Sequence, residues 1–420
     1  MSPRRVLLAA VAALLTFAPA AAAQTSAGPR LEGAKAAIVM EASTGDVLFA
    51  RNPRLRREIA STTKLMTVLV ALERDDLDDV FSAADYQASP IESQIGLRAG
   101  ERMSVRDLLR AALLPSANDA AATLAAGTMG TTAAFVREMN RTAGLLRLHD
   151  TSFANPVGLD DPHNYSSARD LATLAIRLRR YDFFRRTVDL PRATLRSGER
   201  IRTVLNRNTL VRRVAAVDGV KTGRTNRAGY VLVGSATSRG VTVVSVVLGE
   251  PTEHARDADS LALLRYGLAS YDAVTPVPEG RVLGRVALRY RRGESVEVVA
   301  GGTVRRVLRK GVRTSVSVVG LPGEVDGPLP RGSRLGTATV RAGSEVLGRV
   351  PVVTARPVAE ASVATRLDDL VGRPETIVAL VLLLACSLPL LLLRRRVLRD
   401  RRALDAEHRR ARRREESAVQ

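Results

Sequence analysis

Three short groups of residues carry side chains that could cooperate in acyl transfer: Ser61-Thr62-Thr63-Lys64, Ser116-Ala117-Asn118 and Lys221-Thr222-Gly223. Residues three positions apart on a helix lie on one face, with Cβ atoms about 5–6 Å apart, so the Lys64 amine can reach the Ser61 hydroxyl. A serine at a helix start lies beside unpaired backbone amides, which favour negative charge. The pattern is typical of a serine nucleophile whose proton passes to an amine as an oxyanion forms.

A lysine can act as a base only if its pKa falls well below the ordinary value. Burial and a second cation would both lower the pKa of Lys64, and Lys221 is the candidate for that cation. Only four of the 64 basic residues are Lys, and two of the four lie in these motifs. Because Arg does not readily lose its proton at neutral pH, a retained Lys is well suited to the role of base.

Each motif also has an ordinary structural interpretation. Ser61 could be a helix N-cap, and residues 116–118, which follow Pro115, could form a turn between helices. Residues 217–223 are predicted to form a strand followed by a turn, where Gly223 would allow close approach of a ligand to the backbone. The three motifs together favour a single acyl-transfer site, because each supplies groups that such a site needs.

The region that must position these motifs, residues 30–275, mixes strand and helix periodicities. Strands are predicted at 36–40, 47–50, 217–223, 230–235 and 241–248. Helices are predicted at 61–74, 104–115 and 119–126. Strands at both ends with helices between them predict an α+β domain, in which helices pack around one antiparallel sheet.

A change of texture follows Pro276 and Pro278. Residues 279–355 consist of short alternating apolar runs separated by Gly, which predicts a small all-β domain. Residues 356–375 form a polar, Pro-containing stretch and are predicted to be a linker.

Both ends of the chain carry targeting signals. Residues 1–23 combine an early pair of Arg, an apolar run and an Ala-rich cleavage site, which predicts a secretory signal peptide. Residues 376–393 contain no charge and predict one C-terminal transmembrane helix. The Arg-rich segment 394–420 then predicts a cytoplasmic tail, either helical or disordered, with the catalytic domain outside the cell. The predicted location is therefore the cell membrane, with a single pass.

Composition excludes several other classes of function. The net charge is +21, but aromatic residues make up only 3% of the chain and no basic cluster alternates with stacking residues, which argues against nucleic-acid binding. The four His are scattered and the single Cys, Cys386, lies in an apolar run, so neither a zinc site nor an intramolecular disulfide is expected. No cofactor is expected either.

The motifs and their surroundings resemble the serine D-alanyl-D-alanine carboxypeptidases, the low-molecular-mass penicillin-binding proteins. Residues 59–67 (Ile-Ala-Ser-Thr-Thr-Lys-Leu-Met-Thr), 165–170 (Tyr-Ser-Ser-Ala-Arg-Asp) and 217–223 (Val-Asp-Gly-Val-Lys-Thr-Gly) all look like family segments. The resemblance is clear over about residues 30–275 and looser over 280–355. It implies the penicillin-recognising serine transpeptidase-like fold, peptidoglycan stem peptides ending in D-Ala-D-Ala as substrates, and β-lactams as acylating inhibitors.

The resemblance also implies a role for each matching residue. Ser61 would attack the carbonyl of the penultimate D-Ala, Lys64 would take its proton, and Ser116 would relay a proton to the leaving amine. Residues expected to hold the substrate are Asn118, Lys221, Thr222, Gly223, Arg224 and Arg256. The backbone amides of Ser61 and Arg224 would form the oxyanion hole. Residue 224 is Arg where His is common, and a true membrane span replaces the amphipathic anchor that is frequent in the family.

Three alternatives remain open at the level of sequence. A DD-endopeptidase that cuts cross-links would form the same acyl-enzyme. A class A β-lactamase would use a Glu to activate the deacylating water, but no Glu occurs between Glu138 and Glu199, where Asp160 and Asp161 are the acidic residues nearest to that role. A non-catalytic cell-wall-binding protein would use the β-rich domain instead.

Overall fold

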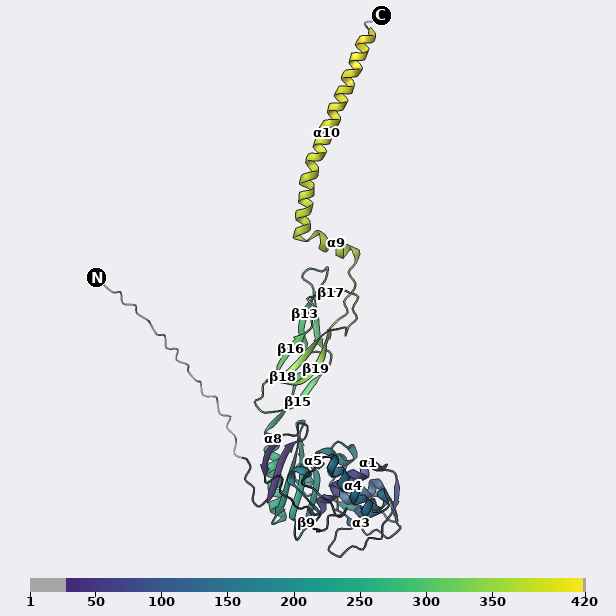
Figure 1. The fold of residues 1–420 in the computed structure, drawn as a ribbon, viewed down its shortest axis with the longest axis vertical. Coiled ribbons are helices and arrows are strands. Elements are labelled where there is room, and N and C mark those ends of the chain that lie inside the picture. Colours follow the sequence, from purple (N-terminus) through teal and green to yellow (C-terminus); the bar gives the residue numbers. More distant parts are fainter. Residues whose placement is uncertain (1–27, 418–420) are drawn as a thin grey trace, which may run out of the picture. The chain divides into compact units, whose positions relative to one another are not determined.

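The computed structural model describes residues 28–417, and its chain divides into two compact units between Asp272 and Ala273 (Figure 1). The predicted signal peptide, residues 1–23, lies outside the described residues. Each unit has a hydrophobic core of its own.

The first unit is built on a five-stranded antiparallel sheet with the strand order β2-β1-β11-β10-β9. The strands are β1 (Ala36–Glu41), β2 (Val47–Arg51), β9 (Val217–Thr225), β10 (Gly229–Ser238) and β11 (Val241–Glu250). All six residues of β1 are buried, and because alternate residues of a strand point to opposite faces, both faces of the sheet are covered there. Strand β9 forms one edge of the sheet and leaves that edge available to the helical part of the unit.

Helices from both sides of the sequence cover this sheet. Helix α8 (Glu253–Ala269) packs against β10 and β11, and α5 (Ala168–Leu178) packs against β1 and β11. The remaining helices are η1 (Ala60–Thr63, a 3-10 turn), α1 (Lys64–Arg74), α2 (Val105–Leu113), α3 (Asn118–Met129), α4 (Thr132–Leu145), α6 (Asp182–Val188) and α7 (Leu210–Arg213). Short two-stranded ribbons connect them: β3 (Arg57–Glu58) with β6 (Tyr165–Ser166), β4 (Val80–Ser82) with β5 (Arg102–Ser104), and β7 (Arg192–Leu195) with β8 (Arg202–Leu205).

The second unit contains the predicted all-β region. Its six-stranded sheet has the order β16-β18-β19-β14-β13-β17, and β12 (Tyr271–Val277) pairs separately with β15 (Val304–Arg309). The strands of the larger sheet are β13 (Val282–Leu288), β14 (Ser295–Ala300), β16 (Ser315–Val319), β17 (Glu324–Val325), β18 (Arg334–Ala342) and β19 (Glu345–Thr354). The α+β class of the first unit and the β-rich character of the second confirm the fold predicted from the sequence.

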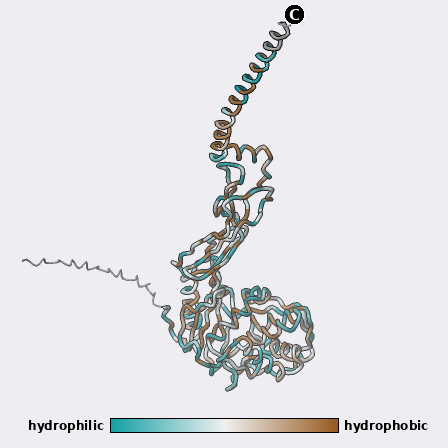
Figure 2. Tube along the Cα trace, turned by 45° about the horizontal axis from the view of Figure 1, so that its top comes forward, coloured by the Kyte–Doolittle hydropathy of each residue, from teal (hydrophilic) through white to brown (hydrophobic). Residues whose placement is uncertain are grey.

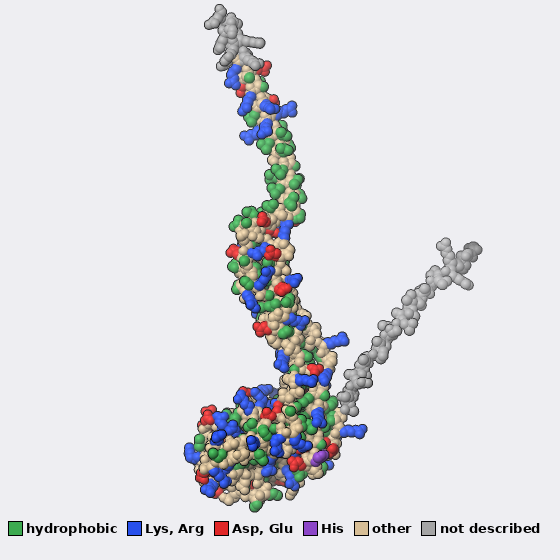
Figure 3. Space-filling model, turned by 180° about the vertical axis from the view of Figure 1, so that it is seen from behind, with side chains coloured by type: hydrophobic (Ala, Val, Ile, Leu, Met, Phe, Trp, Pro, Cys, Tyr) green, Lys and Arg blue, Asp and Glu red, His purple; other side chains and the backbone are tan. Residues whose placement is uncertain are grey.

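Two helices end the described chain. Helix α9 (Val363–Val371) lies inside the stretch predicted as a linker, and α10 runs without a break over Pro374–Ser417. Hydrophobic residues form the first part of α10 (Figure 2), and the space-filling view shows Lys and Arg side chains along its later part (Figure 3). Within the described residues, Pro374–Arg409 is the one helix long and apolar enough to cross a membrane, and its apolar window is not buried.

Local structure at two motifs differs from the sequence expectation. Ser61 lies in η1 and the regular α-helix begins only at Lys64, so the predicted helix over 61–74 opens with a tighter 3-10 turn. Strand β9 continues through Gly223 to Thr225, because pairing with β10 extends to Gly229, whereas a turn was expected at Gly223. The Lys-Thr-Gly motif therefore lies within an edge strand.

Candidate active site

The turn that carries Ser61 is shaped by unusual backbone conformations. Ala60 has a φ of +47°, a region that few residues other than Gly adopt. Gly158, at φ +86°, packs against this turn so closely that an added Cβ would lie 2.2 Å from the Ala60 carbonyl oxygen. The surrounding structure thus holds the turn that carries Ser61 in a strained form, as is common at functional sites.

Lys64 begins α1 directly below Ser61 and is completely buried. Its Nζ lies 3.1 Å from Ser61 Oγ, 2.5 Å from Asn118 Oδ1 and 2.5 Å from the Val157 carbonyl oxygen. Burial lowers the pKa of Lys64 to about 7; the carboxylate of Glu92 partly offsets this effect and the Arg207 guanidinium adds to it. The predicted contact between the amine and the hydroxyl is present, and the amine is close to half neutral at pH 7.

The Ser-Ala-Asn motif joins α2 to α3. Ser116 has a φ of +69°, another strained backbone position, and Asn118 is the first residue of α3. The Asn118 backbone N–H donates to the Ser93 carbonyl (2.7 Å), which fixes the start of α3 against the loop before β5. Ser116 Oγ accepts a hydrogen bond from Lys221 Nζ (2.9 Å), so the second and third motifs meet directly.

The Lys-Thr-Gly motif presents the edge of β9 to η1. Lys221 is buried, and burial lowers its pKa well below the ordinary value, with Lys64, Arg207 and Arg256 acting in the same direction. A Cβ added to Gly223 would lie 3.0 Å from the Ser61 backbone nitrogen and 2.7 Å from Val231 Cγ2. Gly is therefore needed at position 223 because the strand approaches the backbone of Ser61.

These elements surround a cleft of about 500 Å³. Seven of the nine sequence-predicted site residues line it: Ser61, Ser116, Asn118, Thr222, Gly223, Arg224 and Arg256. Lys64 and Lys221 lie just beneath its surface, where they bond Ser61 and Ser116. All nine predicted residues are thus brought together.

Two of the cleft arginines flank the ring of Tyr230. The guanidinium carbon of Arg224 lies 5.1 Å from the ring centroid and that of Arg256 lies 6.0 Å from it. Arg256 is buried and is held by Glu253 and Asp257 through hydrogen bonds of 2.7–3.0 Å. These contacts pair part of its charge, yet the side chain still reaches the cleft.

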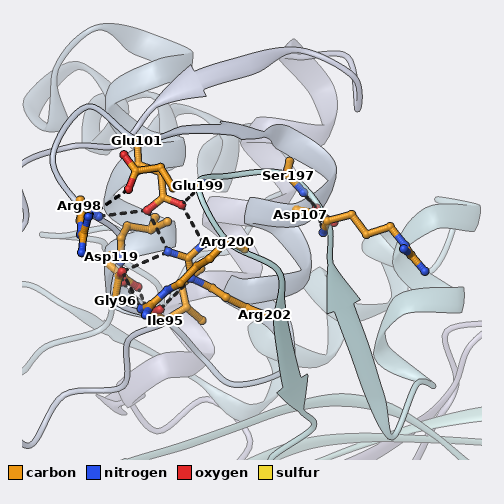
Figure 4. Close-up of polar contacts among 12 residues, drawn as sticks. Ile95, Gly96, Arg98, Glu101, Asp107, Asp119, Ser197, Glu199, Arg200 and Arg202 are labelled. Carbon is orange, nitrogen blue, oxygen red and sulfur yellow. Dashed lines mark hydrogen bonds and ion pairs between the residues drawn. The ribbon is translucent and has the colours of Figure 1, made fainter.

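Sequence reasoning did not identify several residues of this cleft. Glu92, Val157 and Arg207 contact or influence Lys64, although none belongs to a recognisable motif. The loop that follows Glu92 is fixed to α3 and β8 through Ile95 and Gly96 (Figure 4). The one sequence signal for the position of this loop was Asp119, because an acidic residue in the first turn of a helix can accept backbone N–H groups of an adjacent loop. In the structure Asp119 accepts the backbone N–H groups of residues 95 and 97.

The described residues contain no group of three or more His, Cys, Asp and Glu side chains that could hold a metal ion. The cleft contains two serine–lysine pairs, Ser61 with Lys64 and Ser116 with Lys221, in which protons can pass between hydroxyl and amine groups.

Comparison with known proteins places this arrangement in a family. The family model described as D-alanyl-D-alanine carboxypeptidase matches residues 22–252. D-alanyl-D-alanine carboxypeptidase DacF of Bacillus subtilis is 30% identical over 86% of this chain and 95% of its own length. A D-alanyl-D-alanine endopeptidase of Pseudomonas aeruginosa is 33% identical over 69% of this chain and 96% of its own. The crystal structure of penicillin binding protein 5 from Haemophilus influenzae superposes with a TM-score of 0.58 at 28% identity, covering 80% of this chain and all of that one.

A family match over more than half of the chain agrees with the serine–lysine geometry of the cleft. The chain belongs to the D-alanyl-D-alanine carboxypeptidase family of serine peptidases.

Proposed function

We propose that this chain removes the terminal D-Ala from peptidoglycan stem peptides, with Ser61 as nucleophile and an acyl-enzyme as intermediate. The observation that carries this proposal is the buried Lys64 amine, 3.1 Å from the Ser61 hydroxyl and with a pKa lowered by burial to about 7. An amine of this kind is an effective general base at neutral pH, because a catalytic pKa near the operating pH combines the correct protonation state with sufficient basicity.

The hydrogen bonds around Lys64 support the direction of proton transfer. A neutral amine has two N–H donors and one lone pair. Asn118 Oδ1 and the Val157 carbonyl oxygen can only accept, so they take the two N–H groups. The lone pair is then left for the third neighbour, the Ser61 hydroxyl, which becomes the donor when the amine is neutral.

Ser116 and Lys221 form a second pair suited to the leaving group. Lys221 Nζ also donates to the Thr222 carbonyl (2.8 Å), which holds the amine beside Ser116 Oγ. In our proposal the Ser116 hydroxyl passes a proton to the departing D-Ala amine. The depressed pKa of Lys221, caused by burial and by neighbouring cations, lets this amine share protons with the hydroxyl.

The remaining cleft residues would bind the substrate. Thr222, Arg224 and Arg256 supply a hydroxyl and two guanidinium groups on the wall of the cleft, a combination that suits the terminal carboxylate of the peptide. Asn118 would contact the peptide backbone. The backbone amides of Ser61 and Arg224 would stabilise the oxyanion, and the close approach of Gly223 to the Ser61 nitrogen supports this pairing.

The slow step with penicillins would be deacylation. Of the two Asp residues that the sequence offers for the role of a deacylating carboxylate, Asp160 lines the cleft, but it is exposed and accepts the Thr225 hydroxyl at 2.7 Å. Glu138 is engaged by Arg74 and Arg141. We therefore propose a long-lived penicilloyl-enzyme rather than β-lactamase turnover.

A DD-endopeptidase activity is the second candidate, and the observation that favours it is the relative of that name, which matches nearly its whole length to this chain. The first product of either reaction is the same acyl-enzyme.

The cellular context we propose is a single-pass membrane protein anchored by α10. The cleft would lie outside the cell and the basic end inside, since Arg-rich segments that flank a membrane span stay on the cytoplasmic side.

One experiment tests the main activity and separates the second candidate from it. The wild type and Ser61→Ala are incubated with a synthetic stem pentapeptide and with a cross-linked dimer, and the products are measured by mass spectrometry. We expect D-Ala release from the pentapeptide by the wild type alone. Release by Ser61→Ala at the wild-type rate would contradict the proposed nucleophile, and exclusive cleavage of the dimer would favour the endopeptidase.

A further inference from the structure

The loop between β4 and β5 brings a carboxylate to the proposed base through one intervening amide. Glu92 Oε2 accepts the Asn118 side-chain N–H at 2.6 Å, and Asn118 Oδ1 accepts the Lys64 amine at 2.5 Å on the other side of the same amide. The three groups form a chain from carboxylate to amide to amine, in which the amide donates to Glu92 and accepts from Lys64.

This chain fixes the orientation of the Asn118 amide. If the amide flipped, its oxygen would face the Glu92 carboxylate, which is a repulsive contact. Its NH₂ group would face the Lys64 amine, which could accept it only when neutral and only with the lone pair that serves Ser61. An aliphatic residue at 92 would leave only the Lys64 bond to hold the amide. The carboxylate is therefore a stronger constraint on Asn118 than the motif alone provides.

The carboxylate is itself held in place. Glu92 Oε2 also accepts the Tyr86 hydroxyl at 2.5 Å, and Oε1 accepts the Ser89 backbone N–H at 3.1 Å. Burial raises the pKa of Glu92, but the hydrogen bonds from Tyr86 and Asn118 outweigh it, and the pKa lies below its ordinary value. The group is therefore an anion at neutral pH.

The loop beyond Glu92 is fixed by a separate network (Figure 4). The Asp119 carboxylate accepts the backbone N–H groups of Ile95 and Leu97 at 3.1 and 3.0 Å. Arg202 donates to the Ile95 and Gly96 carbonyls at 3.1 and 3.2 Å and pairs with Glu101 at 2.8 Å. Glu92 is thus presented to Asn118 by a loop tied to α3 and β8.

We propose that Glu92 is a positioning residue for acylation: it locks the Asn118 amide against Lys64 and sets the electrostatic environment in which that amine works. This inference rests on the proposed role of Lys64 as base. The charged groups that face Lys64 are Glu92 from the loop, Asp119 from α3, Arg207 after β8 and Lys221 from β9. Glu92 is the carboxylate with the largest effect on Lys64, and it opposes burial and Arg207.

The test is the pH dependence of acylation by a fluorescent penicillin, measured from pH 5 to 9 on the full chain. Glu92→Gln keeps the size of the side chain and an oxygen that can accept the Asn118 N–H, but it removes the negative charge. Loss of that charge disfavours the protonated form of Lys64. We expect the acid limb of its rate profile to move to lower pH by roughly half a unit or more. Glu92→Ala should move the limb in the same direction and also lower the plateau further than Glu92→Gln, because the Asn118 amide loses its partner.

Asp85→Asn is the matched control, because it removes a carboxylate from the same loop. Asp85 is exposed and bonds Gln87 rather than the cleft, so its acid limb should coincide with that of the wild type. An acid limb in Glu92→Gln that coincides with the wild-type limb would overturn the inference whatever the plateau, because a merely structural role would lower the plateau alone. If Glu92→Ala does not fold, comparing the acid limbs of Glu92→Gln and Asp85→Asn still tests the inference. A wild type that reacts normally at pH 5 would instead refute the role of Lys64, and the inference with it.

Discussion

Replacing Lys64 by Arg separates charge from basicity at the centre of the cleft. The wild-type amine, with a pKa of about 7, is about half neutral at pH 7. An Arg at this position would be neutral in fewer than about one molecule in 10⁵, because the guanidinium pKa exceeds 12. The positive charge would be retained, but the lone pair that faces Ser61 would be lost. A general base contributes about 10²–10⁴-fold to a rate, so Lys64→Arg should slow acylation by that factor.

The assay is the second-order rate of labelling by a fluorescent penicillin at pH 7, followed on quenched samples. Lys310→Arg is the matched control: it makes the same chemical change at an exposed position in the β-rich unit and should leave the rate unchanged. Thermal unfolding of both variants shows whether the larger guanidinium is tolerated at a completely buried position. A folded Lys64→Arg variant that is labelled within about tenfold of the wild-type rate would remove Lys64 from the role of base.

Three further predictions follow from the geometry. Wild-type acylation should fall about tenfold for each pH unit below 7, since only the neutral form of Lys64 accepts the proton; a rate that stays flat from pH 8 to 5 would contradict the assignment. Gly223→Ala should slow labelling by at least about tenfold, because the new Cβ presses on the backbone nitrogen of Ser61, whereas Gly302→Ala, which meets only a side-chain atom at 3.6 Å, should have no effect. Arg202→Met should lower the free energy of unfolding by about 3–5 kcal/mol, because it leaves the Glu101 carboxylate buried without its partner. The hydrogen bond from Arg202 lowers the pKa of Glu101 to about 2, so this stabilisation is present above about pH 4.5 and is lost as the pH falls towards 2; equal wild-type and variant stability at pH 7, in denaturant titrations, would disprove it.

The contact between Ser61 and Lys64 could be predicted from local spacing. The Ser-x-x-Lys interval dictates that the amine meets the hydroxyl on one helical face, and the contact of 3.1 Å has this origin. The antiparallel sheet could be predicted from apolar runs at both ends of the region, because such strands must pair to bury both faces. The meeting of Lys221 with Ser116 could be inferred only from the chemistry that joins the motifs, since 105 residues separate them.

The site residues that could not be predicted lie in loops whose sequences have no periodic pattern. Glu92 and the Val157 carbonyl reach Lys64 from irregular segments, whose positions are decided by tertiary contacts rather than by local propensity. The sequence analysis expected Lys221 to be the cation that lowers the pKa of Lys64, and this expectation was incomplete. Burial and Arg207 lower the pKa of Lys64, whereas the coupling with Lys221 is expressed in the lowered pKa of Lys221. No pattern in the sequence marks an exposed Arg as a neighbour of a buried amine.

The central claim is that one serine becomes covalently acylated. The most direct measurement is mass spectrometry of the full chain after incubation with benzylpenicillin, followed by proteolysis to locate the adduct. We predict one added penicilloyl group on the peptide that contains Ser61, persisting after excess penicillin is removed. An adduct on any other residue, or an unmodified protein after prolonged incubation, would contradict the account.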